Sequence, residues 1–307
     1  VCMVIVVILG ILVCSIGVQN GVERITKVMM IGLILLMLAL AIRGITLKGG
    51  MDGLKFYLLP NIEQIQKVGW LNVIVAAMNQ SFFTLSIGMG SMAIFGSYID
   101  KEKRLLGEAL NVGLLDTFVA IMSGLIIFPA CFAFNVNPDS GPNLIFITLP
   151  KVFVGMSGGR IWGSIFFLFM TFAAFSTVIA VFENIIACTM ELFSWSRKKS
   201  AGINLILIIV LSLPCTLGTN ILKDFQPLGD GSGILGLEDF MVSNVILPLG
   251  SLIYLLFCTT RFGWGFEKYQ EEANQGSGLK VPNWLRYYVS YVLPILVFII
   301  FLKGIIR

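Results

Sequence analysis

The stretch Phe83-Thr84-Leu85-Ser86-Ile87-Gly88-Met89-Gly90 is the most informative part of the sequence, because it interrupts sequence that is apolar on both sides. It combines two glycines with two hydroxyl side chains at a depth where a membrane helix should continue. In hydrocarbon every backbone N–H and C=O group needs a partner, so exposed main chain has to line a cavity that protein protects. We therefore predict a broken helix whose carbonyl groups and hydroxyls form a binding site. A glycine notch for close helix packing is the alternative interpretation.

The composition indicates an integral membrane protein. Charged residues make up 12% and hydrophobic residues 57% of the 307 residues, whereas soluble domains carry about 25% charged residues. The mean hydropathy is +0.92. The formal net charge of +4 is spread over short loops, which is a signal of membrane topology and not a footprint of nucleic-acid binding. The sequence contains no histidine, the commonest general base and metal ligand, so we do not expect an intramembrane enzyme.

Apolar windows of about 20 residues predict eight transmembrane helices. The alternation of Lys and Arg between loops predicts that both chain ends lie outside the cell. Segments 50–66 and 143–157 are too short or too polar to span the bilayer and are predicted to be external helical caps. The chain begins inside an apolar run without an initiator Met or a charged flank, so we expect further sequence upstream. The predicted helices cover residues 1–18, 26–47, 70–98, 105–134, 161–193, 202–221, 237–260 and 284–303.

A single carboxylate, Asp116, lies deep in the apolar segment 105–134. An ionised carboxylate that is alone in hydrocarbon is costly, so Asp116 is expected to be protonated, ion-paired or bound to a metal ion. The neighbouring spans contain no Lys or Arg at matching depth, which favours a bound cation. The alternative is an interfacial carboxylate that is hydrogen-bonded to Thr117.

Three neutral oxygens share one helical face in Ala173-Ala174-Phe175-Ser176-Thr177. Positions i, i+3 and i+4 of a helix lie on the same face. The Ala173 carbonyl group and the hydroxyls of Ser176 and Thr177 therefore suit a hard monovalent cation. The alternative is that both hydroxyls donate back to the preceding turn, and taken alone the motif favours this alternative.

These motifs resemble the neurotransmitter:sodium symporter family. The family's sixth helix is similar to residues Gln80–Gly90 with the following Ser97-Tyr98. Its fourth external loop is similar to Asn143–Pro150, and its eighth helix is similar to Ala173–Thr177. The resemblance covers essentially the whole chain, from the family's fourth helix through its eleventh. It implies an all-α integral membrane protein, a leucine-transporter-like inverted-repeat bundle of the bacterial eleven-helix type.

The resemblance also divides the chain within one transmembrane domain, 1–307. Residues 1–47 match the end of the first repeat, 70–260 the second repeat, and 284–303 an additional helix. The family's first three helices have no counterpart in this sequence.

The resemblance implies two sodium sites, both incomplete without the family's first helix. Thr84 and Asp116 match ligands of the first sodium ion, and Ala173, Ser176 and Thr177 match those of the second. An acid at position 116 would supply the negative charge that animal relatives obtain from chloride, so we expect chloride independence. Positions around the substrate are matched by Phe83, Thr84, Ser86, Met89, Thr177 and Val181. Phe83 would act as an aromatic lid above the substrate.

Gate positions follow from the same resemblance. Asp239 matches the external acidic gate residue, and Glu191 with Tyr98 matches part of the cytoplasmic closure. Glu183 stands where relatives vary and receives no role.

We therefore predict sodium-coupled symport of an amino acid by alternating access, in a multi-pass protein of the bacterial plasma membrane. Met89 replaces a bulkier phenylalanine of some relatives, and its flexible thioether favours a large hydrophobic or aromatic substrate. Two alternatives stay open. One is a proton-coupled carrier or cation channel in which Asp116 titrates, and the other is a truncated, non-transporting fragment. The expected partners are the amino acid and the lipid bilayer, and the sequence indicates no particular oligomeric state.

Overall fold

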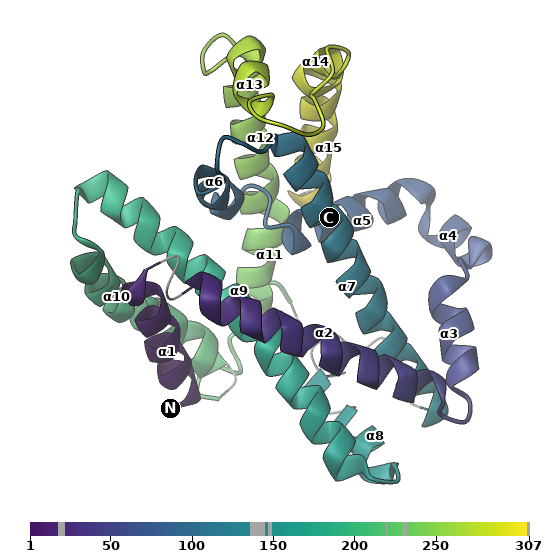
Figure 1. Ribbon diagram of the computed structural model, residues 1–307. Helices are drawn as coiled ribbons and strands as arrows, with labels where there is room; N and C mark the ends of the chain where they lie inside the picture. Colours follow the sequence, from purple (N-terminus) through teal and green to yellow (C-terminus); the bar gives the residue numbers. More distant parts are fainter. Residues whose placement is uncertain (18–21, 136–144, 147–148, 219, 230–231, 306–307) are drawn as a thin grey trace. The chain divides into compact units, whose positions relative to one another are not determined.

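The computed structural model describes residues 1–17, 22–135, 145–146, 149–218, 220–229 and 232–305 (Figure 1). Every regular element in these ranges is a helix, which confirms the predicted all-α fold. In chain order the elements are α1 (Cys2–Ile16), α2 (Arg24–Ile45), α3 (Gly50–Leu58), α4 (Ile62–Val68), α5 (Trp70–Thr84), α6 (Ser91–Ser97), α7 (Leu105–Ala133), α8 (Leu149–Gly155), α9 (Gly159–Phe193), α10 (Arg197–Gly218), α11 (Ile234–Phe240), the π-helix η3 (Met241–Ile246), α12 (Leu247–Thr259), α13 (Phe266–Ala273), α14 (Leu285–Tyr287), the π-helix η4 (Tyr288–Val292) and α15 (Leu293–Ile305).

Six helical segments of the described residues are long and apolar enough to cross a membrane. They are α2, α7, α9, α10, the continuous segment Ile234–Thr259 and the segment Leu285–Ile305. The predicted span 1–18 forms α1, which has 15 residues, and the predicted span 70–98 is divided between α5 and α6. The count of eight spans therefore stays a prediction. The helix predicted at 202–221 begins earlier, at Arg197, because its basic first residues also adopt helical backbone.

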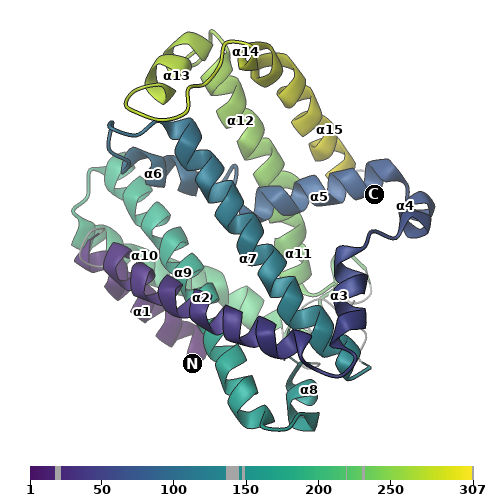
Figure 2. The same cartoon turned by 45° about the vertical axis from the view of Figure 1, so that its right-hand side comes forward.

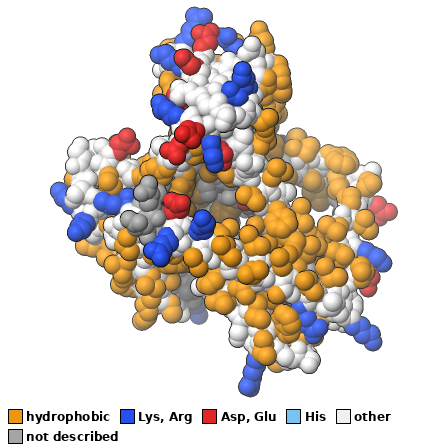
Figure 3. All heavy atoms as spheres, viewed as in Figure 1, with side chains coloured by type: hydrophobic (Ala, Val, Ile, Leu, Met, Phe, Trp, Pro, Cys, Tyr) orange, Lys and Arg blue, Asp and Glu red, His pale blue; other side chains and the backbone are white. Residues whose placement is uncertain are grey.

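The long helices carry apolar side chains on their outer faces. Leu35 is 63% exposed, Leu114 69% and Ile206 67%. Orange hydrophobic side chains cover much of the face drawn in Figure 3. Large exposed apolar surface in a folded chain marks contact with lipid or a partner, and here it follows the membrane-length helices.

The two segments predicted as external caps are helical where the structure describes them. Residues 50–66 contain α3 and most of α4, and the described part of 143–157 contains α8. Tyr57 of α3 stacks on Phe128 of α7, with ring centroids 4.8 Å apart. Residues 136–144 and 147–148, which include half of the motif from Asn143 to Pro150, lie outside the described residues.

The chain forms two compact units, and each is described by itself. Unit 1 comprises Val1–Val7, Ile65–Asp116 and Asn184–Arg307, and unit 2 comprises Ile8–Gln64 and Thr117–Glu183. The long helices α7 and α9 are each divided between the two units, α7 after Asp116 and α9 before Asn184.

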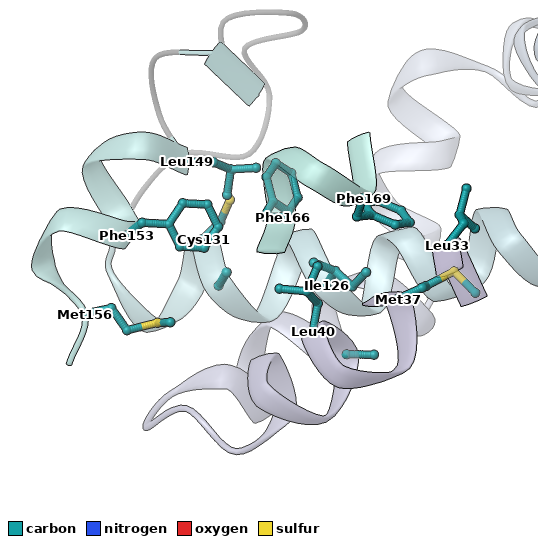
Figure 4. Close-up of a cluster of buried hydrophobic side chains, with 12 residues drawn as sticks. Leu33, Met37, Leu40, Ile126, Cys131, Leu149, Phe153, Met156, Phe166 and Phe169 are labelled. Atoms are coloured by element: carbon teal, nitrogen blue, oxygen red, sulfur yellow. The ribbon is translucent and has the colours of Figure 1, made fainter. Parts of the chain in front are cut away.

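The core of unit 2 is a cluster of apolar side chains from four helices (Figure 4). Met37 of α2, Cys131 of α7, Leu149 of α8 and Phe166 of α9 are each at most 1% exposed. The remaining buried members of the cluster are Leu33, Leu40, Ala41, Ile126, Ala130, Phe153, Met156 and Phe169. The buried residues of each helix recur about one turn apart, as helical periodicity requires.

The core of unit 1 joins α5, α12 and α15 through Phe82, Leu247, Val297 and Ile300. The helices α12 and α15 run side by side in both ribbon views (Figures 1 and 2). A second, smaller cluster lies beyond the end of α12. It consists of Phe266, Ala273 and Val281.

Candidate functional site

The structure confirms that the helix is broken. The helix α5 ends at Thr84 and α6 begins at Ser91. Between them three residues have left-handed backbone, namely Ser86 with φ 51°, Gly88 with φ 89° and Gly90 with φ 86°. Side chains with a Cβ atom rarely adopt this region, so the two glycines let the chain leave the helix and re-enter it.

The same glycines also form a packing notch. A Cβ atom at Gly88 would lie 2.3 Å from the Leu247 carbonyl oxygen of α12, and one at Gly250 would lie 2.3 Å from the Gly88 carbonyl oxygen. The break and α12 therefore touch backbone to backbone. The two interpretations of the sequence are not exclusive, because the structure contains both the break and the notch.

A hydrogen bond ties the break to α9. The Nδ2 group of Asn184 donates to the Met89 carbonyl oxygen at 3.2 Å. Tyr254 of α12 also lies beside the break, since a Cβ atom at Gly90 would lie 2.9 Å from its hydroxyl oxygen. Asn184 and Tyr254 are not among the predicted site residues. A polar residue in the middle of the apolar helix 161–193 was the available signal for Asn184.

The predicted substrate residues of the break differ in exposure. Phe83 is 46% exposed, whereas the preceding Phe82 is 8% exposed and packs with Leu247. An exposed ring at position 83 is available to cover a ligand. Ser86 and Met89 are half-buried, and the Met89 side chain packs against the cluster around Phe82.

Thr84 and Asp116, the predicted ligands of the first sodium ion, both belong to unit 1. The Thr84 hydroxyl donates to the Ser81 carbonyl oxygen at 3.5 Å, a long contact. Asp116 is half-buried on α7, and no described Lys or Arg forms an ion pair with it. The described residues contain no cluster of three or more His, Cys, Asp and Glu side chains that would hold a metal ion. The available donor set is therefore one carboxylate with hydroxyl and carbonyl oxygens.

The second predicted site lies in unit 2, on the uninterrupted helix α9. The hydroxyls of Ser176 and Thr177 donate to the Ala173 carbonyl oxygen at 2.8 Å and 3.3 Å. The structure thus gathers the three oxygens and shows the back-bonding that the sequence analysis kept as an alternative. A hydroxyl that donates still has lone pairs to offer a cation, but the carbonyl oxygen already accepts two bonds. Val181, one turn further along α9, is half-buried.

The predicted cytoplasmic gate residues share one cavity. Tyr98 and Glu191 both line a space of about 490 Å³ in unit 1, together with Met190, Trp195 and Arg197. The predicted external gate residue is exposed on α11, where the Asp239 carboxylate accepts a hydrogen bond from the Ser243 hydroxyl at 3.1 Å.

Glu183, to which the sequence analysis gave no role, is fully buried on α9. It directly precedes Asn184, the residue that bonds the break. The pair places two polar side chains in consecutive positions of an otherwise apolar helix.

A family model described as the sodium:neurotransmitter symporter family matches residues 1–307. An uncharacterized sodium-dependent transporter of Bacillus subtilis, YhdH, is 33% identical over 296 residues, which cover 96% of this chain and 64% of that protein. A similar transporter of Haemophilus influenzae is 30% identical over 302 residues, with 97% and 64% covered. The chain therefore spans about 64% of the length of these relatives.

More distant relatives and a solved structure agree with this match. The sodium- and chloride-dependent taurine transporter of Rattus norvegicus is 24% identical over 270 residues, which cover 85% of this chain and 42% of that protein. The crystal structure of MhsT in complex with L-phenylalanine has a TM-score of 0.84 and 36% identity, and the match covers 98% of this chain and 66% of that one. The matched proteins are transporters and not enzymes.

Proposed function

The chain belongs to the sodium:neurotransmitter symporter family, and from that premise we propose that it forms the larger part of a sodium-coupled amino-acid symporter. The proposal includes a location in a bacterial plasma membrane. One observation carries it, the backbone break between α5 and α6 with left-handed residues at 86, 88 and 90. Broken helices at mid-membrane are the sites where transporters of this architecture bind substrate and ions.

The available ligands suit Na⁺. The oxygens of Thr84, Asp116, Ala173, Ser176 and Thr177 are hard donors, and none of them is a thiolate or an imidazole. Hard cations take such ligands, whereas soft thiolates favour other metals. We assign Thr84 and Asp116 to one coupling ion and the three oxygens of α9 to another.

We propose a hydrophobic or aromatic amino acid as the substrate. The exposed ring of Phe83 offers an apolar cover, Met89 offers a flexible thioether, and the similar solved structure holds L-phenylalanine. Ser86, Val181 and the hydroxyl of Thr177 complete the proposed contacts. Asp239 is assigned to the external gate and Glu191 with Tyr98 to the cytoplasmic one.

Coupling between ion and substrate follows from shared contacts. If Na⁺ at Thr84 and Asp116 also touches the substrate carboxylate, each ligand raises the affinity of the other by the same factor. The membrane potential contributes about 2.3 kcal/mol per charge per 100 mV to the inward movement of sodium.

The test is uptake into proteoliposomes that contain the full-length protein. Labelled phenylalanine, tryptophan, leucine and taurine are offered in the presence of a sodium gradient, a potassium gradient or a proton gradient. We expect uptake of the first three only with sodium. Uptake that follows the proton gradient without sodium would favour the proton-coupled carrier and contradict the proposal.

A further inference from the structure

A second cavity of unit 1 lies away from the broken helix. It has a volume of about 870 Å³ and is formed by the end of α12, the loop that follows, the start of α13, α14 and η4. None of the residues assigned to ion binding, substrate binding or gating lines it. The cavity is therefore separate from the residues assigned to transport.

The cavity wall is basic. Arg261, Lys268 and Arg286 line it, and Glu267 is the acidic side chain among the lining residues. Three positive charges and one negative charge leave a net charge of +2. Arg286 and Glu267 form an ion pair at 3.5 Å, with side chains 53% and 83% exposed. Such an exposed pair contributes little to stability, so an anion can compete for the guanidinium group.

The wall is held in shape by backbone and aromatic contacts. The backbone N–H group of Trp264 donates to the Phe257 carbonyl oxygen at 2.7 Å. A Cβ atom at Gly263 would lie 2.3 Å from that same oxygen, so only glycine fits this tight turn. The guanidinium carbon of Arg286 lies 5.9 Å from the ring centroid of Phe266, which is 4% exposed. The basic side chains thus project from a folded framework.

The cavity sits at the ends of two membrane-length segments. One segment, Ile234–Thr259, ends at a lining residue, and the other, Leu285–Ile305, begins next to the lining residue Arg286. Lys, Arg, Asp and Glu side chains gather over α13 and α14 in Figure 3. The positive-inside rule places this end at the cytoplasmic surface.

Aromatic side chains complete the wall at the same level. Trp264 is 41% exposed, Tyr287 71% and Tyr291 65%. Tryptophan and tyrosine concentrate at the height of lipid headgroups, where one end of the ring is wet and the other apolar. The hydroxyls of Thr260 and Ser290 also belong to the lining and can donate to an anion.

We propose that this cavity binds the phosphate headgroup of an anionic phospholipid of the cytoplasmic leaflet. Clustered basic residues between helices at that surface are suited to anionic headgroups. The guanidinium groups provide planar, paired donors for phosphate oxygens. The exposed aromatic rings flank the space that the glycerol backbone and the first acyl carbons would occupy. A lipid is favoured over a soluble phosphate because the cavity lies where two membrane-length segments end.

The experiment measures lipid binding to the purified, delipidated chain in detergent by native mass spectrometry. The probes are phosphatidylglycerol, phosphatidylcholine and inorganic phosphate. The test variant carries Arg261→Gln, Lys268→Gln and Arg286→Gln. The matched control carries Lys101→Gln, Lys198→Gln and Lys280→Gln, three exposed lysines that do not line the cavity.

We expect phosphatidylglycerol to bind the native chain and the control, and to bind the test variant about 100-fold more weakly, because each basic residue that lines the cavity and faces the headgroup contributes about fivefold. If the triple variant unfolds at a lower temperature than the control, the double variant with Arg261→Gln and Lys268→Gln replaces it, with a loss of about 25-fold.

Three outcomes would overturn the proposal. Equal loss in test and control variants would mean that net charge alone attracts the lipid. Equal binding of phosphatidylcholine would mean that the cavity does not select an anion. Inorganic phosphate that binds as tightly as phosphatidylglycerol, and displaces it, would identify a soluble phosphate as the ligand.

Discussion

Two hydroxyl-bearing stretches of apolar helix have opposite outcomes in this molecule. At residues 84–90 the helix breaks, whereas at residues 173–177 it continues without interruption. Both stretches offer Ser and Thr hydroxyls, but only the first contains glycines, at 88 and 90, and these two glycines together with Ser86 adopt left-handed backbone. In the second stretch the hydroxyls bond within the helix to Ala173. The comparison teaches that hydroxyls alone do not unwind a helix, and that glycines held by a neighbouring helix do.

The largest expected effect comes from giving the break a side chain. Gly88→Ala places a Cβ atom against the Leu247 carbonyl oxygen and in left-handed backbone. The backbone strain costs about 1–2 kcal/mol, and overpacking adds about 1–3 kcal/mol. The temperature of unfolding in detergent should therefore fall sharply.

The matched control is Gly96→Ala, because a Cβ atom at Gly96 meets no atom within 4 Å. Alanine is the better helix former by about 1 kcal/mol, so this variant should be as stable as the native chain or slightly more stable. Equal destabilisation by both variants would mean that the contact with α12 does not hold the break.

The next effect tests Asp116, the carboxylate proposed as a sodium ligand. Asp116→Ala should reduce sodium-dependent uptake about 100-fold, because the proposed ion would lose its charged ligand. Replacing chloride by gluconate should leave native uptake unchanged. Unaltered uptake and unaltered sodium dependence in Asp116→Ala would refute the assignment of this ligand.

A smaller effect is expected on the unbroken helix. Ser176→Ala should raise the sodium concentration for half-maximal uptake about tenfold, since one neutral ligand is lost. Helix stability should change little, because back-bonding hydroxyls contribute little to a helix. Ser164→Ala is the control, since the Ser164 hydroxyl also donates to a backbone carbonyl oxygen of the preceding turn of α9, that of Arg160, at 2.8 Å. A tenfold shift in both variants would contradict a specific site at Ala173.

The smallest expected effect concerns the tie between α9 and the break. Asn184→Ala removes the hydrogen bond to the Met89 carbonyl oxygen and should cost about 1 kcal/mol of stability. Asn111→Ala, at an exposed position of α7, should change stability by less than about 0.5 kcal/mol. Chemical denaturation of both variants in the same detergent gives the comparison, and equal midpoints would show that the tie is dispensable.

The sequence predicts the broken helix because its signal is local. Two glycines and two hydroxyls within eight residues favour an interruption of the span, and the structure contains the break at Gly88 and Gly90. The long helices are likewise visible as apolar runs. The resemblance to the family implies the all-α fold, and the structure agrees with it.

The contacts of the break could not be read from the sequence, because they join residues far apart in the chain. Gly250 lies in an ordinary apolar segment, and nothing in its neighbours indicates that it touches Gly88. Asn184 donates to a backbone carbonyl group, and such a partner has no characteristic residue type that could be recognised in the sequence. The π-helices η3 and η4 could not be predicted from the pattern of apolar residues either. A π-helix adds about one residue to a turn, which is a local change in an otherwise regular helix.

The contact between Gly88 and Gly250 has a consequence for how this chain can vary. The two positions form a single mutational unit, because neither can gain a carbon atom unless the other backbone withdraws. Saturation mutagenesis of α12 should therefore find that only glycine is tolerated at position 250, whereas several amino acids are tolerated at the neighbouring lipid-facing positions. This restriction on positions 88 and 250 comes from backbone contact alone, without a hydrogen bond, a charge or a side chain, so a search for interacting side chains would not find it.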